Sequence, residues 1–301
     1  MAACDGAITC LRGAQRLASW GSRYGKICRV MRPFAHSLHK LTTGRKSIHA
    51  TFLLSQEARI TIQCWRALLC LVRADEKQFT RSIASFCPST STYIAEFDSS
   101  LSGIGVIWSR VTDGAEVILG VCAFPIGFLS FRDDSSYQNL AEFLGALIAI
   151  VGFARMNFQG HALKLRGDSI TALTWAITER PRGELVTKAA MAWTLVSIAS
   201  DVHIADVEHI PGVQNDKCDR LSRRFQGTEL SVEDELEQMG LAGAHVLHLE
   251  NDTAVRELLR CCDPNIPVST DETFMSFWGW MRETVTSALR SLPSDAPPFR
   301  V

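Results

Sequence analysis

The sequence predicts an α/β domain built on a mixed five-stranded sheet with flanking helices, and with mainly helical extensions before and after it. Two observations support this prediction. Three β-branched runs separated by short turns follow one another, which is typical of an antiparallel meander. Two further strand-like runs then alternate with helical segments, and such crossovers add parallel strands to a sheet. The expected order is β-β-β-α-β-α-α-β-α.

The predicted meander is rich in isoleucine and valine, and its strands span about residues 93–97, 103–108 and 117–122. Asp98 directly follows the first strand. Gly103 and Gly105 lie at the start of the second strand, but no third glycine opens a helix after them. The glycine pair therefore does not predict a dinucleotide-binding loop.

Helices and strands alternate in the rest of the predicted domain. The strand after the long first helix stops at Gly167-Asp168, and Pro181 and Gly183 separate the next two helices. Pro211-Gly212 forms a turn before a last, amphipathic helix that ends at about Phe225. The other predicted helices span 138–153, 169–178 and 185–199, and the strands span 162–166 and 202–208.

Charge divides the chain into three parts. Residues 1–90 have 14 Lys or Arg against 4 Asp or Glu, residues 91–225 have 12 against 15, and residues 226–301 have 5 against 13. We predict a basic, mainly helical segment over 1–90, the α/β domain over 91–226, and an acidic linker with a small helical tail over 227–301. A basic segment favours a polyanionic partner, because lysine and arginine near phosphates release counterions. A solvated basic surface is the alternative.

The basic segment contains one clearly amphipathic stretch. Ala58, Ile62, Trp65 and Leu69 recur at spacings of three and four, which predicts a helix over about 55–72.

Composition excludes several classes of protein. With 47% hydrophobic and 21% charged residues over 301 positions, the chain is neither disordered nor collagen-like. Its 10 cysteines lack the spacing of a disulfide scaffold or a zinc finger. The apolar run 143–154 is shorter than the roughly 20 residues of a membrane span, so no membrane partner is expected. We expect an intracellular protein, cytoplasmic or nuclear, although the basic first 50 residues also suit a mitochondrial transit peptide.

Four acidic residues fall where this architecture would bring them together. Asp98 and Asp168 end strands, while Glu142 and Asp219 lie in helices that pack over the same edge. Clustered carboxylates repel one another unless cations neutralise them, and oxygen ligands suit Mg²⁺. Two such ions about 4 Å apart can activate water and stabilise the leaving oxygen of a phosphodiester.

Each acid also has a local alternative role. Asp98 could serve a turn, Asp168 could cap a helix, and Glu142 could interact with a helix dipole. Asp219 could be an exposed partner of Arg220 or Arg223.

Four short motifs follow one another on these elements. They are Asp98-Ser99-Ser100, Asn139-Leu140-Ala141-Glu142, Gly167-Asp168-Ser169, and Asn215 with Asp219-Arg220-Leu221-Ser222-Arg223. Over about residues 92–225 the chain therefore resembles the ribonuclease H domain of retrotransposon reverse transcriptases. The resemblance implies a ribonuclease H-like fold and cleavage of the RNA strand of an RNA–DNA hybrid.

The resemblance also implies roles for individual residues. Asp98, Glu142, Asp168 and Asp219 would be catalytic and would coordinate two Mg²⁺ ions, for which Mn²⁺ is a potential substitute. Asn139 matches a family position that contacts the minor groove of the hybrid. Ser99, Ser100 and Ser169 lie beside these acids and could touch ribose 2′-hydroxyls, with turn or cap hydrogen bonds as their alternative role. His209 is interpreted as structural.

The basic segment resembles, more loosely, the thumb and connection that precede ribonuclease H in retroelement polyproteins. Gly25-Lys26, residues 30–34 and residues 65–69 are the basis of this comparison. The remainder of a reverse transcriptase is therefore a potential partner, and the chain itself has no Tyr-x-Asp-Asp polymerase motif. Two other hypotheses stay open: a catalytically inactive, domesticated or decaying fragment that only binds nucleic acid, and a nuclease of the same fold that cuts DNA.

Overall fold

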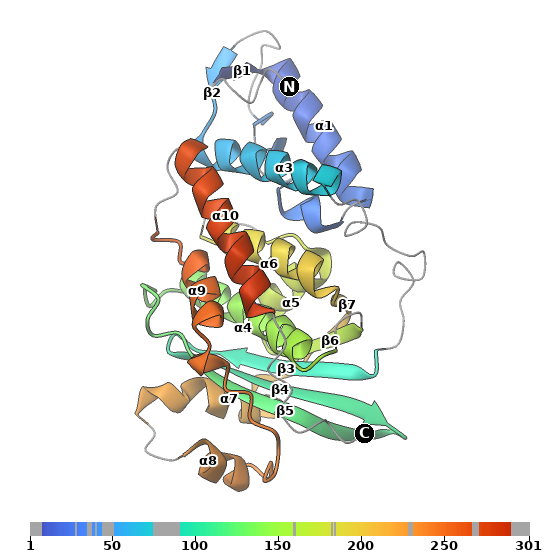
Figure 1. Cartoon of the computed structure of the whole chain (residues 1–301), viewed down its shortest axis with the longest axis vertical. Helices are drawn as coiled ribbons and strands as arrows, with labels where there is room; N and C mark the ends of the chain where they lie inside the picture. Colours follow the sequence, from blue (N-terminus) through green and yellow to red (C-terminus); the bar gives the residue numbers. More distant parts are fainter. Residues whose placement is uncertain are drawn as a thin grey trace.

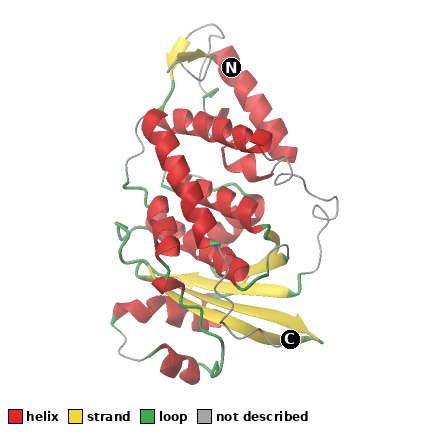
Figure 2. Cartoon of the chain, in the orientation of Figure 1, coloured by secondary structure: helices red, strands yellow, loops and turns green. Residues whose placement is uncertain are grey.

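The computed structural model describes residues 8–27, 29–34, 38–39, 41–43, 51–74, 91–158, 161–181, 183, 185–227, 231–266 and 271–289. A five-stranded sheet crosses the lower half of the molecule, and layers of helices lie above and below it (Figures 1 and 2). The predicted α/β fold with a mixed sheet is confirmed.

The sheet has the strand order β5-β4-β3-β6-β7. The meander β3, β4 and β5 is antiparallel, β6 pairs in parallel with β3, and β7 pairs in parallel with β6. The strands span β3 (Tyr93–Ser99), β4 (Gly103–Thr112), β5 (Ala115–Pro125), β6 (Ala162–Gly167) and β7 (His203–His209). Because β3 and β6 are parallel neighbours, their carboxyl ends reach the same edge of the sheet, and this arrangement positions the site described below.

Three helices cover one face of the sheet (Figure 1): α4 (Ser135–Arg155), α5 (Ile170–Thr178) and α6 (Thr187–Ser200). The central helix is α4, whose N-cap Asp134 accepts hydrogen bonds from the backbone N–H groups of Ser136 and Tyr137. Every residue of α4 from Leu140 to Arg155 is buried, so this helix is apolar around most of its circumference. By length and composition α4 is also long and apolar enough to cross a membrane, but in this structure most of it is buried inside the protein.

A close contact joins α4 to the sheet. The Nε1–H of Trp108 on β4 donates to the carbonyl of Ala149, 2.9 Å away. A Cβ on Gly152 would lie 2.2 Å from the Trp108 ring, so only glycine lets the helix approach this closely.

The opposite face of the sheet is covered by the short helices α7 (Asp216–Arg223) and α8 (Val232–Gln238), which lie below the sheet in Figure 1. Cys218 and Leu221 of α7 and Leu236 of α8 form a second apolar cluster with β4 and β5. The acidic stretch that the sequence predicts as a linker therefore contains a helix, and Ser231 caps it through the N–H of Asp234.

The N-terminal segment forms the upper end of the molecule in Figure 1. Its described elements are an antiparallel pair of strands, two long helices and a 3₁₀ helix that lies between these helices in the sequence. These elements are β1 (Ile8–Cys10), α1 (Leu11–Ile27), η1 (Arg29–Phe34), β2 (Thr51–Leu53) and α3 (Gln56–Ala74). The predicted helix over about 55–72 corresponds to α3, whereas the boundary expected near residue 90 lies outside the described residues.

The C-terminal helices α9 (Thr253–Cys262) and α10 (Asp271–Ala288) pack against the rest of the molecule. The large apolar core runs from Ala14 to Leu289 and includes both helices. The buried guanidinium of Arg155, at the end of α4, binds Asp252 and the carbonyl of Ala288. The described residues from Leu247 to Leu289 thus contribute to the main core, while the division of the chain at residues 90 and 226 stays a prediction.

The segment before α9 also adds to the sheet. The backbone N–H of Val121 on β5 donates to the carbonyl of His245, and the N–H of Leu247 donates to the carbonyl of Val121, both at 2.8 Å. Val121 and Val246 thereby form an isolated parallel bridge along the outer edge of β5.

Candidate active site

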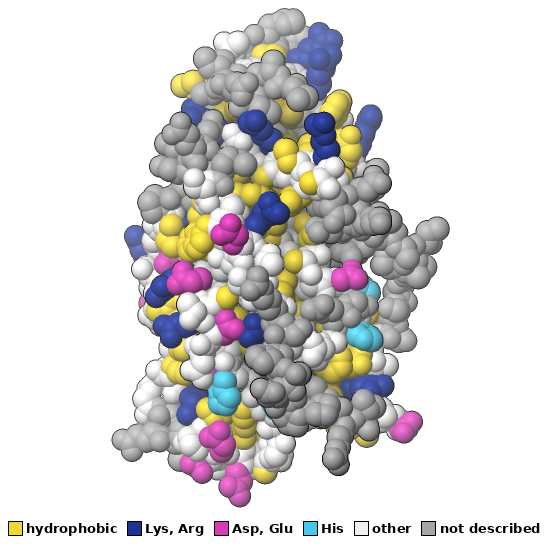
Figure 3. Space-filling view, in the orientation of Figure 1, with side chains coloured by type: hydrophobic (Ala, Val, Ile, Leu, Met, Phe, Trp, Pro, Cys, Tyr) yellow, Lys and Arg dark blue, Asp and Glu magenta, His cyan; other side chains and the backbone are white. Residues whose placement is uncertain are grey.

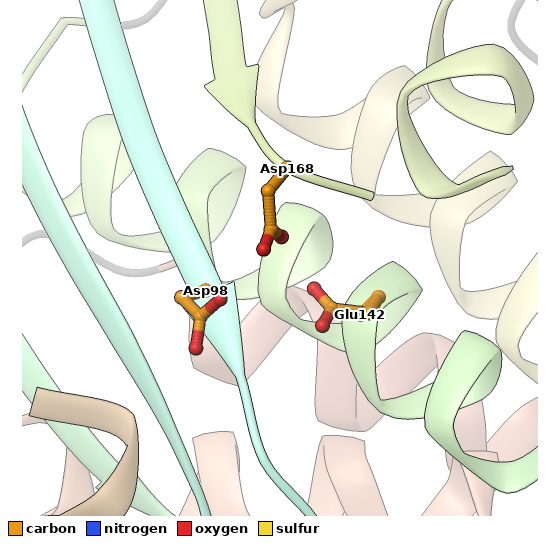
Figure 4. A group of neighbouring side chains, drawn as sticks. All are labelled: Asp98, Glu142 and Asp168. Atoms are coloured by element: carbon orange, nitrogen blue, oxygen red, sulfur yellow. The ribbon is translucent and has the colours of Figure 1, made fainter. Parts of the chain in front are cut away.

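Three carboxylates meet at the edge of the sheet where β3 and β6 end. Asp98 lies near the end of β3, Asp168 follows β6, and Glu142 reaches them from the second turn of α4 (Figure 4). One carboxylate oxygen from each residue lies within 4.8 Å of the others. Such a group could hold a metal ion, because hard cations take oxygen ligands from several carboxylates at once.

Asp98 is held in place from the opposite face of the sheet. Ser222 on α7 donates to its Oδ2 at 2.8 Å, and the Nδ2 of Asn215 lies 3.3 Å from its Oδ1. Asn215 is fully buried and also donates to the carbonyl of Phe97 at 3.1 Å. The turn before α7 and the helix itself therefore orient the Asp98 carboxylate.

Glu142 has one satisfied oxygen and one unsatisfied oxygen. Gln138, one turn earlier on α4, donates to its Oε1 at 3.0 Å and to the carbonyl of Ser99 at 2.6 Å. The Oε2 atom is buried and has no hydrogen-bond partner among the described residues. A buried polar atom without a partner is costly, so this oxygen fits the role of a cation ligand.

The carboxylates disfavour one another's charge. Burial, with further contributions from Asp98 and Asp168, raises the pKa of Glu142 to about 9. Burial also raises the pKa of Asp98 to about 6, although the hydrogen bond from Ser222 acts in the opposite direction. The group therefore binds a proton readily when no cation is present, and a divalent cation would favour the charged forms instead.

These shifts predict that the metal-free protein loses stability as pH rises. The folded protein holds the Glu142 proton from the ordinary carboxyl range near 4.5 up to about 9, whereas the unfolded chain releases it near 4.5. Between pH 5.5 and 8.5 in EDTA, the free energy of unfolding should fall by at least about 1.4 kcal/mol, the equivalent of one pKa unit. Urea unfolding measures this change. MgCl₂ should raise the urea midpoint more at pH 8.5 than at pH 5.5.

The matched control is Glu142→Gln, which should flatten the pH dependence and weaken the effect of MgCl₂. Equal midpoints at both pH values for the unsubstituted chain would contradict the coupling between these carboxylates.

Asp219, the fourth acidic residue predicted for the site, does not belong to the three-carboxylate group. Its Oδ1 accepts a hydrogen bond from the Nε of Arg223 at 2.5 Å, one helical turn later. Its charge nevertheless raises the pKa of both Asp98 and Glu142. The structure thus brings three of the four acids together, and Asp219 makes the local ion pair that the sequence offers as its alternative role.

The three serines beside the acids differ in their surroundings. Ser100 is tied into the turn between β3 and β4: it accepts from the N–H of Gly103 at 3.1 Å and lies 2.9 Å from the Ser222 carbonyl. Ser169 is the N-cap of α5. The Oγ of Ser99 is buried without a partner among the described residues. The half-buried Asn139 lies on α4 next to Gln138. The substrate contacts expected of these four residues stay predictions.

The cap made by Ser169 predicts a measurable loss of stability. Its Oγ accepts from the N–H of Ala172 at 3.3 Å, so Ser169→Ala should lower the free energy of unfolding by about 1 kcal/mol. Ser136→Ala, an exposed serine in the first turn of α4, should change it by less than about 0.5 kcal/mol. Urea unfolding of both variants compares them, and equal effects would contradict the capping role.

Sequence reasoning missed the residues that position the acids. Gln138 stands four residues before Glu142, a spacing that places an amide beside a carboxylate on a helix and could have identified it. The sequence identifies Asn215 and Ser222 only as members of the closing motif, yet both bind Asp98. His209 is the last residue of β7 and is exposed there.

No protein-family model matches the chain, and no curated protein matches it. Among solved structures, the chain is similar to the ribonuclease H1 of the halophilic archaeon Halobacterium salinarum NRC-1. The identity is 20%, the match covers 44% of this chain and 96% of that chain, and the TM-score is 0.33.

Proposed function

We propose that the protein is a ribonuclease H-type endonuclease that hydrolyses the RNA strand of RNA–DNA hybrids by a two-metal mechanism. The observation that supports this most is the convergence of Asp98, Glu142 and Asp168 within 4.8 Å at the carboxyl ends of two parallel strands. The order of strands and helices along the chain, with α4 and α7 carrying the predicted acidic motifs, also supports the proposal.

The residues present fit a divalent cation. Asp98, Glu142 and Asp168 would hold it, and the Oε2 of Glu142, which has no partner in the described part of the chain, is an available ligand atom. Bound Mg²⁺ would supply Lewis-acid stabilisation of the phosphate and an activated water. The chain itself contributes orientation, because Ser222 and Asn215 fix Asp98 while Gln138 fixes Glu142.

We also propose that the chain derives from a retroelement polyprotein. The closing motif from Asn215 to Arg223 supports this proposal, because its pattern resembles that of retroelement ribonuclease H domains. The remainder of a reverse transcriptase would then be a partner.

One observation favours a second candidate function, a fragment that binds nucleic acid without cutting it. Asp219 forms an ion pair with Arg223 and lies outside the three-carboxylate group. If Asp219 remains paired with Arg223 when substrate binds, a second metal ion lacks one of its expected ligands.

Cleavage of labelled nucleic acid by the purified full chain tests the proposal. With MgCl₂ the chain should cut the RNA strand of an RNA–DNA hybrid, and it should leave double-stranded DNA, single-stranded DNA and single-stranded RNA intact. EDTA should abolish the cutting. Tight hybrid binding without cleavage in Mg²⁺ or Mn²⁺ would support the binding fragment, and cutting of DNA alone would support a DNA nuclease.

A further inference from the structure

We propose that the outer face of α1 binds an unpaired nucleic-acid strand, with Trp20 and Tyr24 stacking on bases and three arginines contacting phosphates. This face lies in the N-terminal segment, apart from the acidic group. The choice of nucleic acid as the partner rests in part on the proposed function, whereas the binding itself requires no cleavage.

The helix places these side chains together. Arg12, Arg16, Trp20 and Arg23 recur at spacings of three and four, and Tyr24 follows directly. Residues at such spacings share one face of a helix, and the three arginines extend over about 16 Å of it. All five side chains are exposed, and Trp20 and Tyr24 keep 63% and 44% of their surface open to solvent.

The charge around this face suits a polyanion. Residues 8–74 contain twelve Lys or Arg and one acid, Glu57. On α3, Arg59, Arg66 and Arg73 recur every seven residues and are exposed, which makes a second basic stripe. In Figure 3 the described side chains at this end of the molecule include dark blue groups and no magenta ones on the face shown.

The aromatic side chains form a connected series. The rings of Trp20 and Tyr24 meet edge to face at 6.3 Å, and Tyr24 meets Trp65 of α3 in the same way at 6.5 Å. Trp65 is buried, and its Nε1–H donates to the carbonyl of Phe34 at 3.3 Å. The inner ring thus anchors two outer rings that leave open surface for stacking.

Exposed rings beside arginines favour an unpaired strand over a duplex. Bases stack on aromatic side chains when their faces are free, whereas a duplex buries those faces and presents mainly phosphates and groove edges. A membrane surface is a poorer fit, because it needs an apolar outer face. The apolar residues Leu11, Ala14 and Ala18 of α1 are buried against the protein.

A cavity of about 360 Å³ opens along the other flank of the arginine row. Its lining includes Ser19, Ser22, Arg23 and His39, and none of the described residues that line it is acidic. The Ser22 Oγ and the His39 Nε2 lie 2.6 Å apart, so the polar wall is preorganised. Hydroxyl, imidazole and guanidinium groups are suitable donors for a backbone phosphate.

Fluorescence anisotropy of the full chain in EDTA tests the proposal, with labelled 20-nucleotide oligo(dT) and a blunt 20-base-pair RNA–DNA hybrid as probes. At 50 mM KCl, Trp20→Ala should weaken oligo(dT) binding about five- to tenfold and hybrid binding less than twofold. Arg16→Ala/Arg23→Ala should weaken oligo(dT) binding about tenfold and reduce its salt dependence.

The control removes two exposed arginines elsewhere. Arg132→Ala/Arg282→Ala should leave oligo(dT) affinity within twofold, since these side chains lie in the loop before α4 and on α10. Unchanged oligo(dT) binding by Trp20→Ala, or equal losses on oligo(dT) and hybrid, would overturn the proposal; the second result would assign the face to duplex. If the unsubstituted chain and its variants bind as expected but the unsubstituted chain does not cleave the hybrid, only the proposed nuclease function is contradicted.

Discussion

Replacing Asp98 by asparagine is expected to lower the rate of hybrid cleavage about a thousandfold, the equivalent of roughly 4 kcal/mol of transition-state stabilisation. The substitution removes a charge from the three-carboxylate group but keeps the size of the side chain. Its oxygen can still accept from Asn215, and its new amide can donate to the Ser222 oxygen. The measurement is cleavage of labelled hybrid in saturating MgCl₂ with enzyme in excess.

A measurement of stability separates the loss of cleavage in Asp98→Asn from unfolding of the protein. Because Asp98 raises the pKa of Glu142, its neutral replacement should not lower the urea midpoint in EDTA at pH 8.5. Asp133→Asn makes the same chemical change on an exposed loop residue and should retain full activity. More than a tenth of the original rate in Asp98→Asn would count against Asp98 as a metal ligand.

Adding a single methyl group at Gly105 is expected to disturb both the fold and the site. Gly105 pairs with Asp98 across β3 and β4, and α7 packs directly over it. A Cβ there would lie 2.3 Å from the Cys218 carbonyl and 2.6 Å from the Leu221 Cβ. Gly105→Ala should therefore push α7 away from the sheet and cost about 1–3 kcal/mol of stability.

The displacement of α7 also moves Ser222, which holds Asp98, so cleavage should fall more than the folded fraction does. Urea unfolding and cleavage by the same preparation measure the two effects. The control is Gly127→Ala, because a Cβ on Gly127 meets no atom within 4 Å. A Gly105→Ala protein with unchanged stability and activity would show that α7 does not determine the position of Asp98.

β-branched runs, turn residues and apolar segments predict the strands, the helices and their order within residues 91–226. They give no bounds for α1, whose sequence includes Gly13, Gly21 and Gly25 and has weak intrinsic helix preference. The burial of Leu11, Ala14 and Ala18 against the rest of the N-terminal segment stabilises this helix instead. Leu11, Ala14 and Ala18 recur at spacings of three and four, so the amphipathic pattern of α1 is present in the sequence, but the three glycines within it disguise the helix.

The candidate site is also only partly predictable from the sequence. The predicted strand ends and one predicted helix bring Asp98, Glu142 and Asp168 to a common edge from the sequence alone. The sequence does not determine the direction of the Asp219 side chain, because a residue at this helix position can face either the acids or Arg223. The orientation of Asp98 by Asn215 was equally inaccessible, because it joins residues 117 positions apart.

The bridge between Val121 and Val246 has a consequence for self-association. β5 ends the strand order, and unpaired backbone groups on an edge strand are a template for strands of other molecules. Both backbone groups of Val121 are engaged by His245 and Leu247, and Glu116 adds a charge further along the same strand. A fragment cut at residue 226 would lose this cover and expose the apolar cluster beneath α8, so it should aggregate more readily. In the full chain, residues 245–247 occupy the backbone groups of Val121, to which a strand of a second copy could otherwise bind.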